Sequence, residues 1–372
     1  MFQNTSPEKA ITFTRFCLAL SLFLPLSSRA TKLQTICYKS LKFIVVLSSF
    51  FLFLPIINSL CMYQDPTNVS QSVCFLMGEF QLISNTIIGT VQYDRLQEVI
   101  EVMEACCKNA TLHEKVVFQR YINTYSPFYG SSAIWFYVTG MILILGTLVS
   151  SEPFPTNAEY PFPVDYQPLE TIVFLHQSLV LIQCCAHACI NMFCAFLLLF
   201  AAARFEILKM ELREVMNIEQ FVMCVEKYYT VKRYAKQVVS VVRLEVLCML
   251  VLSAIAVVFC GIILIQPQPL ATKGQYLPVV GTALLEVFVI AWPADHLLDM
   301  SENVMHEIYK SKWYDQDVRM QRDVRVMMLP QKAVAIKVPC LISTLSLNYF
   351  CSFISNVFSL FSVLRIAILK DG

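Results

Sequence analysis

The sequence predicts an all-α fold, a single domain over residues 1–372 that forms a bundle of seven transmembrane helices with an inverted topology. Three observations support this prediction. Hydrophobic residues make up 57% of the chain and charged residues only 15%, whereas soluble domains have roughly 25% charged residues. Seven apolar runs are about as long as, or longer than, the stretch of about 20 residues that a helix needs to cross a bilayer. The cations fall on alternate connections between those runs.

The seven apolar runs lie at residues 43–61, 73–91, 133–150, 171–203, 244–265, 277–294 and 338–364. Pro55 lies inside the first run, where neighbouring helices can satisfy the backbone groups that it frees. The second run is the least apolar of the seven. The third opens with Trp135 and Tyr137, and aromatic residues of this kind are enriched at membrane interfaces. These features are compatible with three successive spans.

The fourth run has no charged side chain from Thr171 to Ala203. A helix of this length covers about 50 Å, which exceeds the thickness of one bilayer. We expect it to continue on the cytoplasmic side to about Asn217, and a second helix to run from Ile218 into the fifth run. Residues 204–243 contain no glycine or proline to interrupt them.

The last three runs are bounded by prolines or by charge. Pro267 and Pro269 end the fifth run, and Pro293 closes the sixth. The seventh carries no charge between Lys337 and Arg365. Because long connections precede the fifth and seventh runs, helices 4–7 are expected to extend into a cytoplasmic anchor bundle.

The cations predict the orientation. All but three of the 28 Lys and Arg lie before residue 43 or within residues 92–132, 204–243 and 295–337. Short cytoplasmic loops retain Lys and Arg, so these segments are expected inside the cell. The N-terminus is then cytoplasmic and the C-terminus extracellular, the reverse of a rhodopsin-type G-protein-coupled receptor. The net charge of +1 provides no bulk attraction for nucleic acid.

The second predicted outside loop, residues 151–170, contains five prolines, four acids and no cation. Proline restricts the backbone, so one interpretation is an ordered, non-helical lid from which Phe154, Phe162 and Tyr166 insert into the bundle. The other interpretation is a solvated loop with incidental aromatics. In the first outside loop, the sequon at Asn68 predicts a glycosylation site.

The fifteen cysteines follow no metal-binding spacing. Most lie inside apolar runs, where a free thiol behaves as a small hydrophobe. Cys61 and Cys74 flank the first outside loop, where a disulfide can persist, and both alternatives remain open for them. The sequence has no phosphate loop, HExxH, GxSxG or CxxC motif. It therefore predicts no enzyme, no metal site and no cofactor.

Glu79 and Glu286 are acids inside predicted spans, which makes them functional candidates by default. Structural hydrogen bonding between helices is the alternative. The outer halves of the second, third, fourth and sixth runs are expected to enclose an apolar pocket under the lid, suited to a small volatile or lipophilic molecule. The candidate ligand-binding residues are Phe80, Ser84, Met141, Leu145, His176 and Val180. His176 and His187 are otherwise expected to be hydrogen-bonded interior histidines.

The last third of the chain carries a recognisable order of motifs. They are residues 296–301 (HLLDMS), 308–309 (IY), 313–314 (WY), 327–332 (MMLPQK) and 358–365 (FSLFSVLR). Together with the charge pattern, this order resembles that of the insect odorant receptors. One departure is Phe358-Ser359, where that family commonly has Tyr-Ser.

The resemblance implies a seven-span tuning subunit with inverted topology. Such subunits assemble with a shared co-receptor as heterotetramers, which are odorant-gated non-selective cation channels in the plasma membrane of sensory-neuron dendrites. The implied ligand is a small volatile odorant, and the implied partners are the co-receptor and the lipid bilayer. The alternatives are a gustatory-type chemoreceptor channel, or a transporter or scaffold without a gate.

The seventh run has serines about one helical turn apart, at Ser352, Ser355, Ser359 and Ser362. Such a stripe suits a wet helix face, although small residues at this spacing also mediate helix packing. The resemblance implies that this run lines the ion path. The expected pore and gate residues are Ser359, Val363, Ile366 and Ala367.

Overall fold

The computed structural model describes residues 7–26, 30–63, 65–147, 153–302, 304–329, 331–338 and 342–370. Within those ranges the chain is helical apart from its loops and one isolated antiparallel bridge between Val338 and Ile342. The all-α prediction is therefore confirmed.

Seven helices are long and apolar enough to cross a membrane. They are α2 (Lys32–Met62), α3 (Pro66–Val91), α5 (Leu112–Gly146), α6 (Leu169–Arg213), α7 (Ile218–Ile265), α8 (Leu270–Glu302) and α10 (Leu347–Lys370). The other elements are α1 (Pro7–Cys17), η1 (Ala19–Ser21), α4 (Tyr93–Asn109), η2 (Met305–Lys310), η3 (Trp313–Asp315) and α9 (Val318–Met327). The count of seven candidate spans in the described chain agrees with the prediction.

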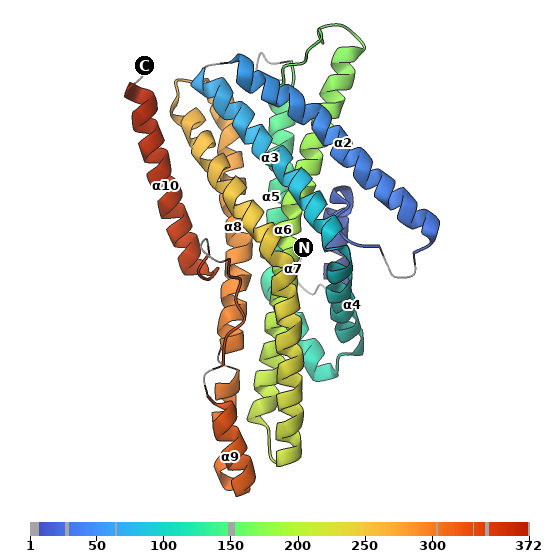
Figure 1. Ribbon diagram of the computed structural model, residues 1–372, viewed down its shortest axis with the longest axis vertical. Coiled ribbons are helices and arrows are strands. Elements are labelled where there is room, and N and C mark those ends of the chain that lie inside the picture. Colours follow the sequence, from blue (N-terminus) through green and yellow to red (C-terminus); the bar gives the residue numbers. More distant parts are fainter. Residues whose placement is uncertain are drawn as a thin grey trace.

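Helix α6 is the centre of the bundle. It packs against α5, α7 and α8 along most of its length and also touches α2 and α3. The most apolar part of α6 is 83% buried, compared with 11% for α10. Ala201, Ala202 and Ala203 are fully buried, and such small side chains allow neighbouring helices to approach closely. Figure 1 shows α6 and α7 running past the lower end of α5.

The break between α6 and α7 lies where the sequence predicts it. Helix α6 ends at Arg213, and Asn217 caps α7 by accepting a hydrogen bond from the Gln220 backbone N–H at 2.9 Å. A side-chain oxygen at this position satisfies a backbone donor that has no partner within the helix. Both helices are therefore continuous from the membrane into the lower end of the molecule, as expected.

Several helices begin earlier than the apolar runs, among them α2 at Lys32 rather than near residue 43. The third span begins at Leu112 rather than near residue 133, so span 3 also extends below the bundle. Thr111 begins it with a capping box that includes Glu114. The apolar run alone missed this extension, because residues 112–132 mix polar and apolar side chains.

The seventh span begins at Leu347 rather than near residue 338, and it does not extend into the anchor. The preceding described residues form an extended segment, in which the Leu345 backbone N–H donates to the Ile336 carbonyl at 3.0 Å. Ile336 and Ile342 are buried in the protein core. Hydropathy reports burial but does not distinguish lipid from protein, so the run appeared longer than the helix.

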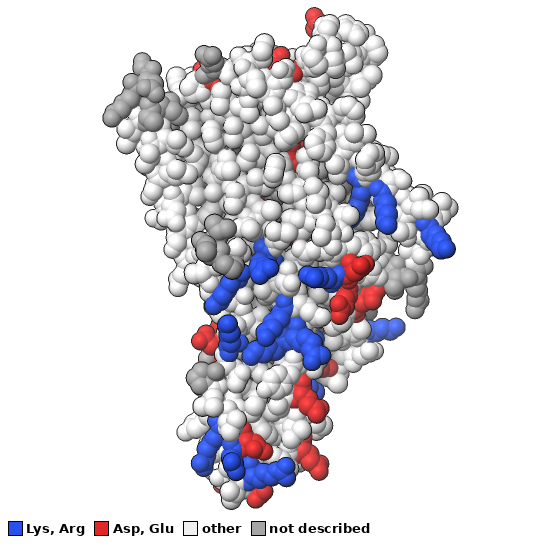
Figure 2. Space-filling view, viewed as in Figure 1, with Lys and Arg blue, Asp and Glu red and all other residues white. Residues whose placement is uncertain are grey.

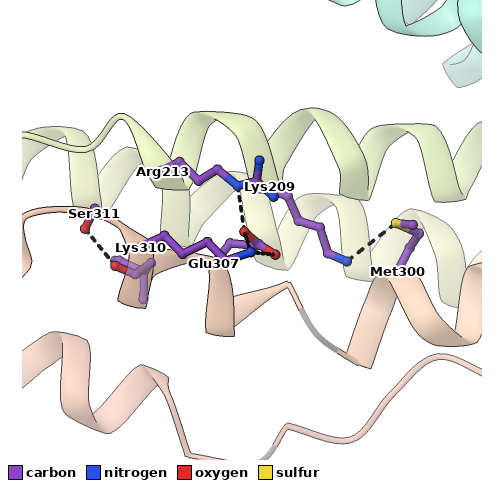
Figure 3. Close-up of polar contacts among 7 residues, drawn as sticks. Lys209, Arg213, Met300, Glu307, Lys310 and Ser311 are labelled. Carbon is purple, nitrogen blue, oxygen red and sulfur yellow. Dashed lines mark hydrogen bonds and ion pairs between the residues drawn. The ribbon is translucent and has the colours of Figure 1, made fainter.

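The anchor is tied together by polar contacts where α6 ends (Figure 3). Arg213 Nε donates to Glu307 Oε2 at 2.6 Å, and Lys310 Nζ lies 2.9 Å from the same oxygen. Lys209 Nζ donates to the Met300 sulfur at 3.5 Å. These contacts join α6 to α8 and η2. Burial alone would raise the pKa of Glu307, but the hydrogen bonds from Arg213 and Lys310 outweigh it and lower that pKa.

We expect Glu307→Gln to lower the stability of the anchor by about 1 kcal/mol, since Arg213 is half exposed and partly screened by solvent. Because folding lowers the pKa of Glu307, its contribution is complete above about pH 4.3, the ordinary pKa of Glu, and is lost as the pH falls. Thermal unfolding in detergent measures both effects. Arg233→Ala, which removes an exposed cation from α7, is the control. An equal loss of thermal stability in both variants would show that the Glu307 contacts do not hold the anchor together.

Candidate functional site

An inner cavity lies between α3, α5, α6, α7 and α8 and has a volume of about 140 Å³. Most of its wall is apolar, including Leu143, Leu181 and Val279. Its polar groups include the carboxyl groups of Glu79 and Glu286 and the hydroxyl of Thr139. An apolar cavity with a few placed polar groups is the usual form of a small-molecule site.

Both acids of the cavity are hydrogen-bonded to neutral groups on other helices. Glu286 accepts from Gln81 Nε2 of α3 at 3.4 Å and from Ser253 Oγ of α7 at 3.3 Å. Glu79 accepts from Ser49 Oγ of α2, and the Cys184 thiol of α6 lies 3.7 Å from its Oε1. Both acids thus join helices through hydrogen bonds, and both also line the cavity, where a ligand could reach them.

A second, larger cavity of about 420 Å³ lies above the first, under the loop between α5 and α6. We call it the vestibule. Phe75, Leu143 and Tyr276 line both spaces and so form the partition between them. The rings of Phe75 and Tyr276 contact edge to face, with their centroids 6.2 Å apart. Movement of these three side chains would connect the vestibule with the inner cavity.

The proline-rich loop is ordered over the part that the structure describes, and residues 153–168 are non-helical as expected. Gln177 of α6 accepts hydrogen bonds from the Thr156 backbone N–H at 3.1 Å and from its hydroxyl at 2.9 Å. The Glu159 backbone N–H donates to the Pro55 carbonyl of α2 at 3.0 Å. These bonds fasten the loop over the vestibule, so it has the form of a lid.

The aromatics of the lid agree only in part with the interpretation that they insert into the bundle. Phe154 is half buried and lines the vestibule. Phe162 and Tyr166 are exposed and do not insert into the bundle. The sequence could not separate them, because all three lie in the same proline-rich context and only tertiary contacts decide which ring turns inward.

The six predicted ligand-binding residues lie on α3, α5 and α6, and each of these helices contributes to the cavity. None of the six lines it. Phe80, Met141 and Leu145 are 51%, 44% and 51% exposed and face outward, whereas Val180 is fully buried in protein contacts. The neighbours of these residues line the cavity instead, among them Glu79, Gln81, Gly140 and Leu181. A shift of one residue turns a side chain by about 100° around the helix, so the six residues lie beside the cavity on helices that line it, and their role in binding a ligand stays a prediction.

Ser84 and His176 make local or interhelical bonds rather than cavity contacts. Ser84 Oγ donates to the Gln81 carbonyl at 3.1 Å. His176 Nε2 lies 3.1 Å from both the hydroxyl and the carbonyl oxygen of Ser48, and so joins α6 to α2. His187 is buried, with Nε2 3.2 Å from Thr86 Oγ1. Both histidines are hydrogen-bonded interior residues, as expected.

Sequence reasoning missed Phe75, Thr139, Leu143, Cys184 and Tyr276 as cavity residues. Thr139 had the clearest signal, because it is polar within a span, and its hydroxyl lies 3.1 Å from that of Thr282 on α8. The aromatic and aliphatic members had none, since residues of the same types cover the lipid-facing surface.

Of the two alternatives for Cys61 and Cys74, the structure has the free thiols rather than the disulfide, as it has for the other cysteines that it describes. Cys74 is buried with its sulfur 3.2 Å from that of Cys260 on α7, whereas Cys61 is exposed. Asn68 lies in the first turn of α3, where Asp65 caps its backbone N–H at 3.2 Å, and it also lines the vestibule.

The predicted pore residues lie on α10, the least buried of the candidate spans. Phe353 and Val357 are buried, and α10 contacts α7 and α8. Ser359 is exposed, as are Val363 and Ile366 at 65% and 56%. The side chain of Ala367 lies outside the described residues.

The serine stripe of α10 is exposed along its length. The hydroxyls of Ser352, Ser359 and Ser362 donate to carbonyl groups one turn back in the same helix. Their hydrogen bonds are therefore satisfied without a neighbouring helix, and the stripe is free to meet water or another subunit.

Comparison with known proteins agrees with this architecture. The sequence profile of the family described as 7tm Odorant receptor matches residues 65–358, so the chain belongs to the odorant receptor family. It is accordingly a receptor with several membrane spans and not an enzyme. Among curated proteins, none matches the sequence.

Two solved structures have the same fold. The insect olfactory receptor OR5 from Machilis hrabei superimposes with a TM-score of 0.79 at 14% identity, over 96% of this chain and 97% of that one. The same receptor in complex with eugenol gives a TM-score of 0.81, also at 14% identity, over 97% of this chain and 98% of that one. The family and this fold favour the odorant receptor over the gustatory-type receptor, the transporter and the scaffold.

Proposed function

We propose that this chain is the odorant-binding subunit of an odorant-gated, non-selective cation channel. It acts with a shared co-receptor as a heterotetramer in the plasma membrane of sensory-neuron dendrites. The observation that carries the proposal is the inner cavity, which lies in the bundle of an odorant receptor directly below a lidded vestibule.

The ligand that fits the cavity is a small volatile molecule. In another protein, an apolar cavity of about 150 Å³ binds benzene, and the inner cavity is of similar volume at about 140 Å³. A receptor with this fold has been solved with eugenol bound. Binding would move Phe75, Leu143 and Tyr276 of the partition, and through α7 and α8 the movement would reach α10, which contacts both helices.

Helix α10 is the element suited to line the ion path. It exposes apolar and hydroxyl side chains on the face turned away from α7 and α8. Apolar constrictions close pores by dewetting, and Val363 and Ile366 are exposed side chains of this kind. In a tetramer, one α10 from each subunit would surround the path, with most copies supplied by the co-receptor.

Filling the inner cavity should abolish or re-tune the odorant response. Leu143→Trp adds bulk at the partition, whereas Leu145→Trp adds the same bulk on the exposed side of α5. We expect currents from cells that express the co-receptor to lose sensitivity by roughly tenfold or more in the first variant and to keep it in the second. Surface labelling checks expression. A loss of odorant sensitivity only in Leu145→Trp would place the odorant site on the lipid-facing side of α5.

The inverted orientation is supported by the distribution of charge. Figure 2 shows Lys and Arg over the lower part of the molecule, and acidic residues with hardly any cations near its upper end. Figure 1 shows the end of α10 at the same upper end as the lid, on the other side of the bundle. An epitope tag after Gly372 should be labelled on intact cells and one before Met1 should not. Labelling of only the N-terminal tag would show that the N-terminus is extracellular and would contradict the inverted orientation.

Substituted cysteines should report whether α10 lines the pore. In a Cys351→Ser background, cysteine at Ser359, Val363 or Ala367 should make the odorant-evoked current sensitive to a charged, membrane-impermeant thiol reagent. Cysteine at Val357, which is buried, should not. Uniform insensitivity at the first three positions would exclude this helix from the ion path.

A further inference from the structure

The inner cavity contains two buried carboxyl groups from different helices. The side chains of Glu79 on α3 and Glu286 on α8 are only 2% and 4% exposed, and both line the cavity. Among the residues that the structure describes, no Lys or Arg lines it. The cavity thus combines an apolar wall with acid groups and no counter-charge of its own.

Both carboxyl groups line the same cavity, from different helices of its wall. Glu79 Oε1 lies 3.7 Å from the Cys184 thiol of α6. Glu286 lies beside Gln81 and Ser253. The bonds that Glu286 accepts are long, at 3.3 and 3.4 Å, and hydrogen bonds of this length are weaker than those near 2.9 Å. Each carboxylate has room for about four hydrogen bonds, so both acids retain acceptor capacity toward a ligand.

An isolated ionised carboxylate is costly to bury unless it is paired with a cation and hydrogen-bonded. A ligand that brought an ammonium group would supply both the charge and the N–H donors. Its hydrocarbon part would meet the apolar wall formed by Leu143, Leu181 and Val279. Charge-assisted hydrogen bonds are roughly twice as strong as neutral ones, so the amine would be favoured over the matching alcohol.

We propose that the inner cavity selects small apolar amines, and that Glu79 and Glu286 hold their ammonium group. This inference rests on the proposed function, because it assigns a ligand class to the same cavity.

The test compares benzylamine, benzyl alcohol and toluene, which share one ring and differ in the terminal group. Currents are recorded from the full chain expressed with the co-receptor. The variants are Glu79→Gln and Glu286→Gln, with Glu245→Gln as a matched control. Glu245 is an equally buried acid of α7 that does not line the cavity. Surface labelling of each variant checks folding, and Glu79→Asp and Glu286→Asp retain the carboxyl group where an amide variant fails to reach the surface.

We expect the unmodified receptor to respond to benzylamine at concentrations about tenfold or more below those needed for benzyl alcohol. Glu79→Gln, Glu286→Gln or both should remove this preference while Glu245→Gln keeps it, and the Asp variants should retain a preference for the amine. A receptor that prefers benzyl alcohol or toluene, or amide variants that keep the preference, would overturn the inference and leave the proposed function intact. A surface-expressed receptor that is silent toward every volatile tried would contradict both.

Discussion

The rest of the structure depends on the burial of helix α6. This helix has no Lys, Arg, Asp or Glu between Thr171 and Ala203, and its most apolar part is largely covered by other helices. Because α5, α7 and α8 all pack on it, their inner faces converge around its outer half. The inner cavity lies where that packing is incomplete, and Leu181 and Cys184 of α6 form part of its wall.

The two ends of the bundle perform different mechanical tasks. At the lower end, ion pairs such as Arg213–Glu307 and the paired helices α6 and α7 hold the anchor together. At the upper end, hydrogen bonds fasten the lid to α2, α3 and α6, and three side chains divide the vestibule from the cavity. A ligand entering from above would therefore meet the lid and then these three side chains, while the anchor keeps the subunit in place. Helix α10 contacts α7 and α8, whose inner faces line the cavity, and is the least packed of the spans.

Periodicity and charge were sufficient to predict the spans and the α6–α7 break, because lipid imposes a strong requirement on length and hydropathy. They failed where protein replaced lipid as the apolar environment. Ile342 was predicted as part of the seventh span but is buried in the non-helical segment before α10. The rotation of each helix was beyond the sequence for the same reason, since Phe80 and Leu143 are both apolar and only one faces the cavity. Glu79 and Glu286 were recognisable in advance because an acid in a span is costly to leave against lipid.

The central claim is that the odorant binds in the inner cavity and not elsewhere in the bundle. The most direct measurement is an electron cryomicroscopy map of the chain with its co-receptor in the presence of an activating volatile. We predict ligand density enclosed by α3, α5, α6, α7 and α8, below Phe75, Leu143 and Tyr276. Density only in the vestibule, or on the outer surface beside Phe80 and Met141, would contradict the account.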